Sequence, residues 1–203
     1  EASHVKVSDL WMELVRNRPL RILSFFFVIA FTTMSISNAA DSYFMSYNIG
    51  ATPMMTTVFM WLGTIPAFIF LPLLPSIKRK IGKAAMFRLF LGISIVGMIL
   101  MYVIVSIPSL SSCFPLVCAI QFIKSVGILV ATGYMWALVP EVVTFGEYTT
   151  GRRVAAIVNA IICIFMKAGM ALGGVIPGFV LAWVGFNASN QVQTPLAQQG
   201  ILW

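Results

Sequence analysis

A single lysine lies in the middle of an apolar stretch near the end of the chain. Lys167 is the only charged residue between 154 and 184 and, as part of a helix, lies about 20 Å from Val154, near the middle of a bilayer. A charge at that depth costs about 2.5–3.5 kcal/mol on insertion scales, so we expect it to face protein or water. Asn159 and Cys163 precede it at intervals of four residues and share its helical face. Such a cation can bind a polyhydroxylated ligand, pair with a carboxylate of another helix, or compete with a transported cation; the alternative is a structural lysine.

Another apolar stretch, 114–139, carries polar groups on one helical face. Gln121, Thr132 and Trp136 recur at helical spacing. Trp136 with Thr132 suits a sugar, because an apolar ring face stacks on indole while hydroxyls bond to polar neighbours. The alternative is a tryptophan of the interfacial belt. Lys124 lies in the same stretch and is either functional or snorkels to the outer surface.

The apolar stretch 20–43 becomes polar in its second half. Asn38 and Asp41 are its most suggestive side chains. Such residues either line a wet cavity or pack against another helix, and Asp41 has the further alternative of lying at the outer water boundary.

Charges also gather at 140–153, where we predict a short acidic loop followed by a basic pair. The members are Glu141, Glu147, Arg152 and Arg153. As ion pairs of a cytoplasmic gate they would form and break as helices move. As exposed pairs they would contribute only about 0–1 kcal/mol each. Both interpretations remain open.

The composition predicts an all-α, polytopic membrane protein. The chain is 60% hydrophobic and 9% charged, with a mean hydropathy of +0.96. The predicted spans are 20–43, 54–74, 86–107, 114–139 and 154–184, with 201–203 opening a sixth. Residues 1–19 are predicted to be a cytoplasmic linker with an amphipathic helix, and 20–203 an incomplete bundle. We expect the chain to be an internal fragment of a larger protein.

The basic residues predict the orientation. Eleven of the 13 Lys and Arg lie in the N-terminal segment, at 78–88 or at 152–153, while the alternate loops have none. The positive-inside rule places these segments, and therefore residues 1–19, in the cytoplasm. Because the basic residues lie beside apolar spans, the net charge of +7 does not indicate nucleic acid. The expected location is a bacterial plasma (inner) membrane.

Several segments resemble one transporter family. The segment ALVPEVVTFGEYTTGRR is followed, 14 residues after Arg153, by Lys167 in MKAGMALGG. These segments resemble the glycoside–pentoside–hexuronide:cation symporters, the melibiose permease group of the major facilitator superfamily. VRNRPLRIL and SYFMSYNIG are similar to the start and end of that family's seventh helix. The resemblance covers nearly the whole chain and implies a C-terminal half, with helices seven to eleven and the beginning of twelve.

The resemblance also implies a function and some roles. It implies cation-coupled symport of a sugar or glycoside by alternating access, with the N-terminal half of the same transporter as partner. The family's eleventh-helix lysine, important for sugar and cation sites, falls on Lys167, and its tenth-helix aromatic is matched loosely by Trp136. The coupling ion, Na⁺ or H⁺, would be bound mainly by the missing N-terminal half.

Rival functions predict other features. A related transporter can carry a different cargo, such as a lysophospholipid, and the apolar walls leave this alternative open. A membrane enzyme needs an acid/base or metal constellation, but the only histidine is His4 and no HExxH motif occurs. The three cysteines have no metal-ligand spacing, so we expect no metal and no cofactor. A channel would need a charged or carbonyl-lined filter, and none is evident.

Overall fold

The computed structural model describes residues 7–107, 110, 113–186 and 201, and all its regular elements in these ranges are helices. They are α1 (Val7–Arg16), α2 (Arg18–Tyr43), the π-helix η1 (Phe44–Asn48), α3 (Pro53–Phe70), α4 (Leu74–Ile81), α5 (Lys83–Val105), α7 (Phe114–Thr150) and α8 (Ala155–Trp183). Five segments are long and apolar enough to cross a membrane: α2 with η1, α3, α5, α7 and α8. The predicted all-α architecture with five spans is therefore confirmed. The predicted opening of a sixth span lies mostly outside the described residues.

Two of the spans begin at capped ends. The Asn17 side chain accepts a hydrogen bond from the Leu20 backbone N–H at 3.0 Å, and Pro19 follows it in the first turn of α2. The Thr52 hydroxyl accepts one from Met55 at 3.3 Å, directly before Pro53. Both caps satisfy backbone donors that have no partner inside the helix, and proline is tolerated there because it lacks a donor.

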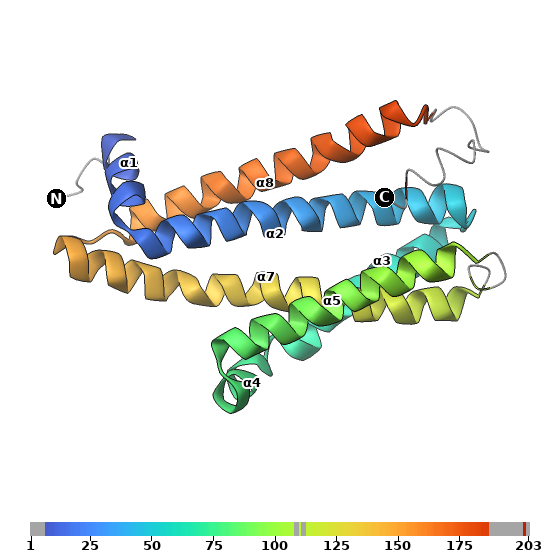
Figure 1. Cartoon of the computed structure of the whole chain (residues 1–203), viewed down its shortest axis with the longest axis horizontal. Helices are drawn as coiled ribbons and strands as arrows, with labels where there is room; N and C mark the ends of the chain where they lie inside the picture. The colour runs from blue at the N-terminus through green and yellow to red at the C-terminus, as the bar shows by residue number, and fades with distance from the viewer. Residues whose placement is uncertain (1–6, 108–109, 111–112, 187–200, 202–203) are drawn as a thin grey trace.

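The long helices run back and forth between two ends of the molecule (Figure 1). Helix α1 and the α7–α8 connection lie at the end drawn on the left, whereas α2 meets η1 at the right. Short helix α4 lies toward the left end of α5. The basic segments of α1, α4 and the α7–α8 connection thus lie on one side, as alternating spans require.

Helix α8 packs closely on α2 through two glycines. A Cβ at Gly169 would lie 2.6 Å from the Val28 carbonyl oxygen, and one at Gly173 would lie 2.4 Å from the Ser35 Cβ. The Thr32 hydroxyl donates to the Gly169 carbonyl at 3.0 Å. Small residues allow this approach in the absence of a hydrophobic driving force between helices in lipid.

Helix α5 packs on α7 by the same means. A Cβ at Gly97 would lie 2.6 Å from the Lys124 Cα, and one at Gly127 would lie 2.3 Å from the Phe90 carbonyl oxygen. Gly92 of the same helix faces open space. Gly92 lies five residues, or about 140° around the helix, from Gly97 and is therefore on a different face of α5.

We expect Gly127→Ala to destabilise the protein by about 1–3 kcal/mol, because the added methyl group meets backbone that cannot move aside cheaply. Gly92→Ala is the matched control and should be neutral or slightly stabilising, since alanine is the better helix former. Unfolding of the purified full-length protein in detergent measures both variants. Equal effects of the two substitutions would contradict the packing described here.

Helix α7 differs most from the predicted elements, because it is longer than the predicted span 114–139. Its 37 residues continue to Thr150, through Pro140, so the predicted loop carrying Glu141 and Glu147 is helical. At 1.5 Å per residue the helix is about 55 Å long, well beyond the roughly 30 Å of a hydrocarbon core. The extension ends at Gly151, whose φ of +66 is left-handed.

Packing on α1 and the start of α2 explains why the extension stays helical. The Asn17 amide donates to the Val142 carbonyl at 3.3 Å and to the Glu13 carboxylate at 3.0 Å. A Cβ at Gly146 would lie 2.7 Å from that carboxylate. Glu13 and Asn17 are both buried. The sequence also predicts a loop at 78–88, but residues up to Ile81 form α4 and α5 begins one residue after Gly82.

Candidate functional site

The structure places a buried ion pair between α2 and α7. The Lys124 ammonium lies 2.5 Å from one carboxylate oxygen of Asp41, and each residue is only 6% exposed. The amide nitrogen of Gln121 donates to the other carboxylate oxygen at 2.8 Å. Both oxygens of Asp41 thus accept a hydrogen bond, and its charge is balanced by Lys124. Such pairing is what makes ionised groups tolerable in an apolar interior.

Local sequence features bring these three residues together. Gln121 and Lys124 are three positions apart on α7 and therefore share a face that α2 can reach. Gly97 of α5 lies against the backbone of Lys124, and Gly63 of α3 leaves space for Gln121. A Cβ at Gly63 would lie 3.0 Å from the Gln121 amide nitrogen. Glycines on two helices therefore make room for the polar group.

A cavity of about 120 Å³ opens beside the ion pair, between α2, α3 and α7. Its walls combine carboxylate, amide and hydroxyl groups with thioethers and aliphatic side chains. The lining residues are Met34, Ser37, Asn38, Asp41, Met60, Gly63, Thr64, Gln121, Ser125, Ile128 and Leu129. This arrangement can hold a small polar group by hydrogen bonds.

The predicted α8 face lies apart from this cavity. Asn159, Cys163 and Lys167 are exposed together on α8, while Val158 and Ile162 are buried. The Asn159 amide donates to the Ala155 carbonyl at 2.8 Å. No ion pair of Lys167 occurs within the described part of the chain. The ammonium is accordingly available to a ligand or to another part of the protein.

Only part of the predicted polar face of α7 reaches the cavity. Gln121, Ser125 and Ile128 line it. The Thr132 hydroxyl donates to the Ile128 carbonyl of its own helix at 2.8 Å. The Trp136 ring lies edge-to-face with Phe27, with centroids 5.0 Å apart, and is 41% exposed. The structure therefore does not bring Thr132 and Trp136 to the Asp41 site.

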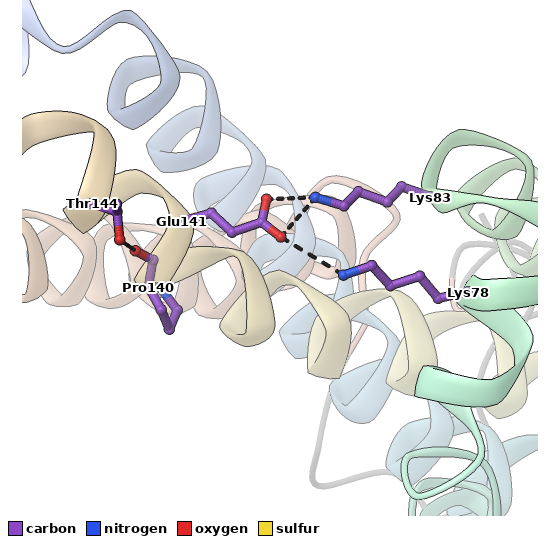
Figure 2. A network of polar contacts seen from close by, with 5 residues as sticks. All are labelled: Lys78, Lys83, Pro140, Glu141 and Thr144. Atoms are coloured by element: carbon purple, nitrogen blue, oxygen red, sulfur yellow. Dashed lines mark hydrogen bonds and ion pairs between the residues drawn. The ribbon is translucent and has the colours of Figure 1, made fainter. Parts of the chain in front are cut away.

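The predicted charge cluster is also divided. Figure 2 shows Glu141 of α7 meeting Lys83 at the start of α5, at 2.6 Å, and Lys78 of α4, at 3.7 Å. Among the described residues, no ion pair joins Glu141 or Glu147 to the exposed Arg152 and Arg153. Glu141 thus ties α7 to α4 and α5, and a gating role for the four residues stays a prediction.

Asp41 stands out in the sequence, but the sequence patterns did not pair it with Lys124. The signal was present, because a lysine buried in an apolar span needs a counter-charge and Asp41 is the acidic residue within another predicted span. The Asp41 side chain is buried against Lys124 and is not exposed to water, while its position relative to the outer water boundary stays a prediction. Snorkelling of Lys124 to the outer surface is wrong, because its side chain is buried against Asp41.

Comparison with known proteins identifies the family. Residues 1–203 match the profile of the family described as MFS/sugar transport protein. The chain belongs to this family. The resemblance to the glycoside–pentoside–hexuronide:cation symporters is confirmed, and the MFS/sugar transport protein family is one of transporters and not of enzymes.

The chain is similar in sequence to three curated proteins with descriptive names. It is 40% identical to "Uncharacterized symporter YnaJ" of Bacillus subtilis (strain 168), over 98% of this chain and 41% of that protein. It is 31% identical to "Glucuronide carrier protein homolog" of Escherichia coli (strain K12), over 93% of this chain and 40% of the relative. It is 27% identical to "Putative glycoside/cation symporter YagG" of the same strain, over 89% of this chain and 38% of that protein. The chain thus spans about two fifths of the length of the curated relatives it matches.

Proposed function

We propose that the chain is the C-terminal half of a secondary active transporter that moves a sugar or glycoside together with Na⁺ or H⁺. The observation that carries the proposal is a buried ion pair beside a polar cavity, inside a bundle of apolar spans from a sugar transport family. Ionised groups buried among apolar spans are costly and are typical of substrate or ion pathways. The names of two relatives, a glucuronide carrier homolog and a putative glycoside/cation symporter, support the cargo class.

Alternating access assigns a role to the exposed face of α8. In transporters built from two halves, the cargo site lies between them near the midplane, and the halves rock around it. Lys167 and Asn159 lie on one exposed face of α8, which would meet the N-terminal half and the cargo under this proposal. Lys167 would hydrogen-bond the sugar or pair with carboxylates of that half. The clustering of basic residues supports, as part of the same proposal, a cytoplasmic location for α1, α4 and the α7–α8 connection in a bacterium.

Uptake by the full-length protein in liposomes tests this proposal. The panel comprises the methyl glycosides of glucose, galactose, xylose and glucuronic acid, each with an inward gradient of Na⁺ or H⁺. We expect at least one glycoside to accumulate above its external concentration and to leave when the ion gradient is dissipated. Transport of a lysophospholipid with no accumulation of any glycoside would favour the rival cargo and contradict the proposal.

A further inference from the structure

The buried site has one acceptor that the protein leaves without a donor. The Gln121 amide nitrogen is committed to Asp41 at 2.8 Å, which fixes the orientation of the amide group. Its oxygen is buried and has no hydrogen-bond partner among the described residues. Gln121 as a whole is 3% exposed and lines the cavity between α2, α3 and α7. A buried acceptor without a donor is costly, so this site favours a ligand that donates.

The charge of the site decides which kind of donor fits. Asp41 is already neutralised by the Lys124 ammonium at 2.5 Å. A further cation would be repelled by that ammonium at short range in an apolar environment, where charges interact strongly. A neutral hydroxyl group meets no such repulsion, and it would donate to the Gln121 oxygen after a small rearrangement of the cavity wall, because that oxygen is itself buried. Ser37, Thr64 and Ser125 line the same space, and the Thr64 hydroxyl donates to the Met60 carbonyl of its own helix at 3.2 Å.

The size of the cavity decides how much of a ligand enters. Its volume of about 120 Å³ exceeds what one water molecule needs. It is smaller than the roughly 300–1,000 Å³ of pockets that enclose whole drug-sized ligands. One hydroxyl-bearing edge of a sugar ring fits these limits, with the rest of the ring outside.

We propose that the cavity beside Asp41, Gln121 and Lys124 is a hydroxyl-binding subsite for one edge of a transported sugar, with the Gln121 amide oxygen as acceptor. Lys124 acts through Asp41, which in turn orients the Gln121 amide. The inference rests on the proposed function and adds a specificity determinant on the C-terminal half, distinct from the Lys167 face.

Deoxy sugars test the subsite in the full-length protein. The probe is whichever of the four methyl glycosides named above the wild type accumulates, together with its monodeoxy analogues. In the wild type, one deoxy position should raise KM by about two- to tenfold, the range for one hydrogen bond. Gln121→Met removes the acceptor, so the parent sugar and that analogue should then have equal KM. A merely structural role of Gln121 would affect all analogues alike and leave the difference unchanged.

A second variant tests the subsite without replacing Gln121. A Cβ at Gly63 would lie 3.0 Å from the Gln121 amide nitrogen and 3.4 Å from the Ser125 hydroxyl, so Gly63→Ala narrows the cavity. We expect it to raise KM for the parent sugar, whereas Gly92→Ala, which enters open space, should not.

Three results would overturn the subsite. The first is that Gln121→Met shows the same difference in KM between the parent sugar and its deoxy analogue as the wild type does. The second is a change in the half-saturating Na⁺ or H⁺ concentration with unchanged sugar KM, which would make the cavity a cation site. The third is a wild type that accumulates none of the glycosides, which would also remove the proposed function. The wild type alone reveals that last failure, so the two proposals fail distinguishably.

Discussion

Asp41→Asn is expected to lower the free energy of unfolding of the full-length protein by about 3–5 kcal/mol, the range for breaking a buried ion pair by removing one partner. The substitution leaves the Lys124 ammonium buried without its counter-charge, 6% exposed between α2, α5 and α7. Gln121 also loses the carboxylate to which it donates. Thermal or denaturant unfolding in detergent measures the loss.

The double variant Asp41→Asn with Lys124→Met separates the cost of one unpaired buried charge from the net contribution of the ion pair to stability. No unpaired charge remains, so most of the lost stability should return, because neutral replacements of a buried pair are often tolerated. Glu141→Gln is the matched control. It breaks an ion pair of similar length, 2.6 Å to Lys83, whose side chains are about half exposed, and it should cost far less. A double variant as unstable as the worse single variant would contradict this account.

Lys167→Gln is expected to abolish ion-driven accumulation while leaving stability close to that of the wild type. The side chain is exposed on α8 and has no ion pair among the described residues, so its removal leaves no buried charge behind. Its proposed partners are the sugar and the carboxylates of the N-terminal half. Uptake in liposomes and unfolding in detergent, measured on the same preparation, provide both quantities.

The control for Lys167 is another exposed lysine. Lys80→Gln in α4 removes the same charge far from the α8 face and should preserve accumulation. If Lys167→Gln accumulates sugar as well as the wild type does, the lysine has no part in coupling. If it unfolds far more easily than Lys80→Gln, its role is structural, as the alternative interpretation of the sequence allows.

The five spans follow from hydropathy because each needs only a long apolar run, a property of consecutive residues. The end of α7 does not follow from it. Pro140, Glu141 and Glu147 have the composition of a loop, yet packing against Glu13 and Asn17 maintains the helix. That packing joins residues more than 120 positions apart, which a local pattern does not register.

The site was partly predictable for a related reason. The cost of a buried charge draws attention to Lys124 and Lys167 wherever they lie, and the structure separates their environments completely. Pairing Asp41 with Lys124 required knowing that α2 and α7 meet at these two residues. Helical spacing predicted Gln121 as a site residue. Thr132 lies on the same predicted face, but its hydroxyl donates to a carbonyl of its own helix. Periodicity therefore identifies which residues share a helix face but not which other helices pack against that face.

The length of α7 has a mechanical consequence. One continuous helix joins the buried pair at Lys124, the contacts of Glu141 with α4 and α5, and the contact of Gly146 with α1. Lys124 and Gly146 are about 33 Å apart along this rod, so a tilt of about 5° at one end displaces the other by about 3 Å. That displacement matches the length of a hydrogen bond. If α7 tilts as one body through Pro140, a small rotation at the polar cavity would therefore be amplified into the making or breaking of individual contacts with α1, α4 and α5.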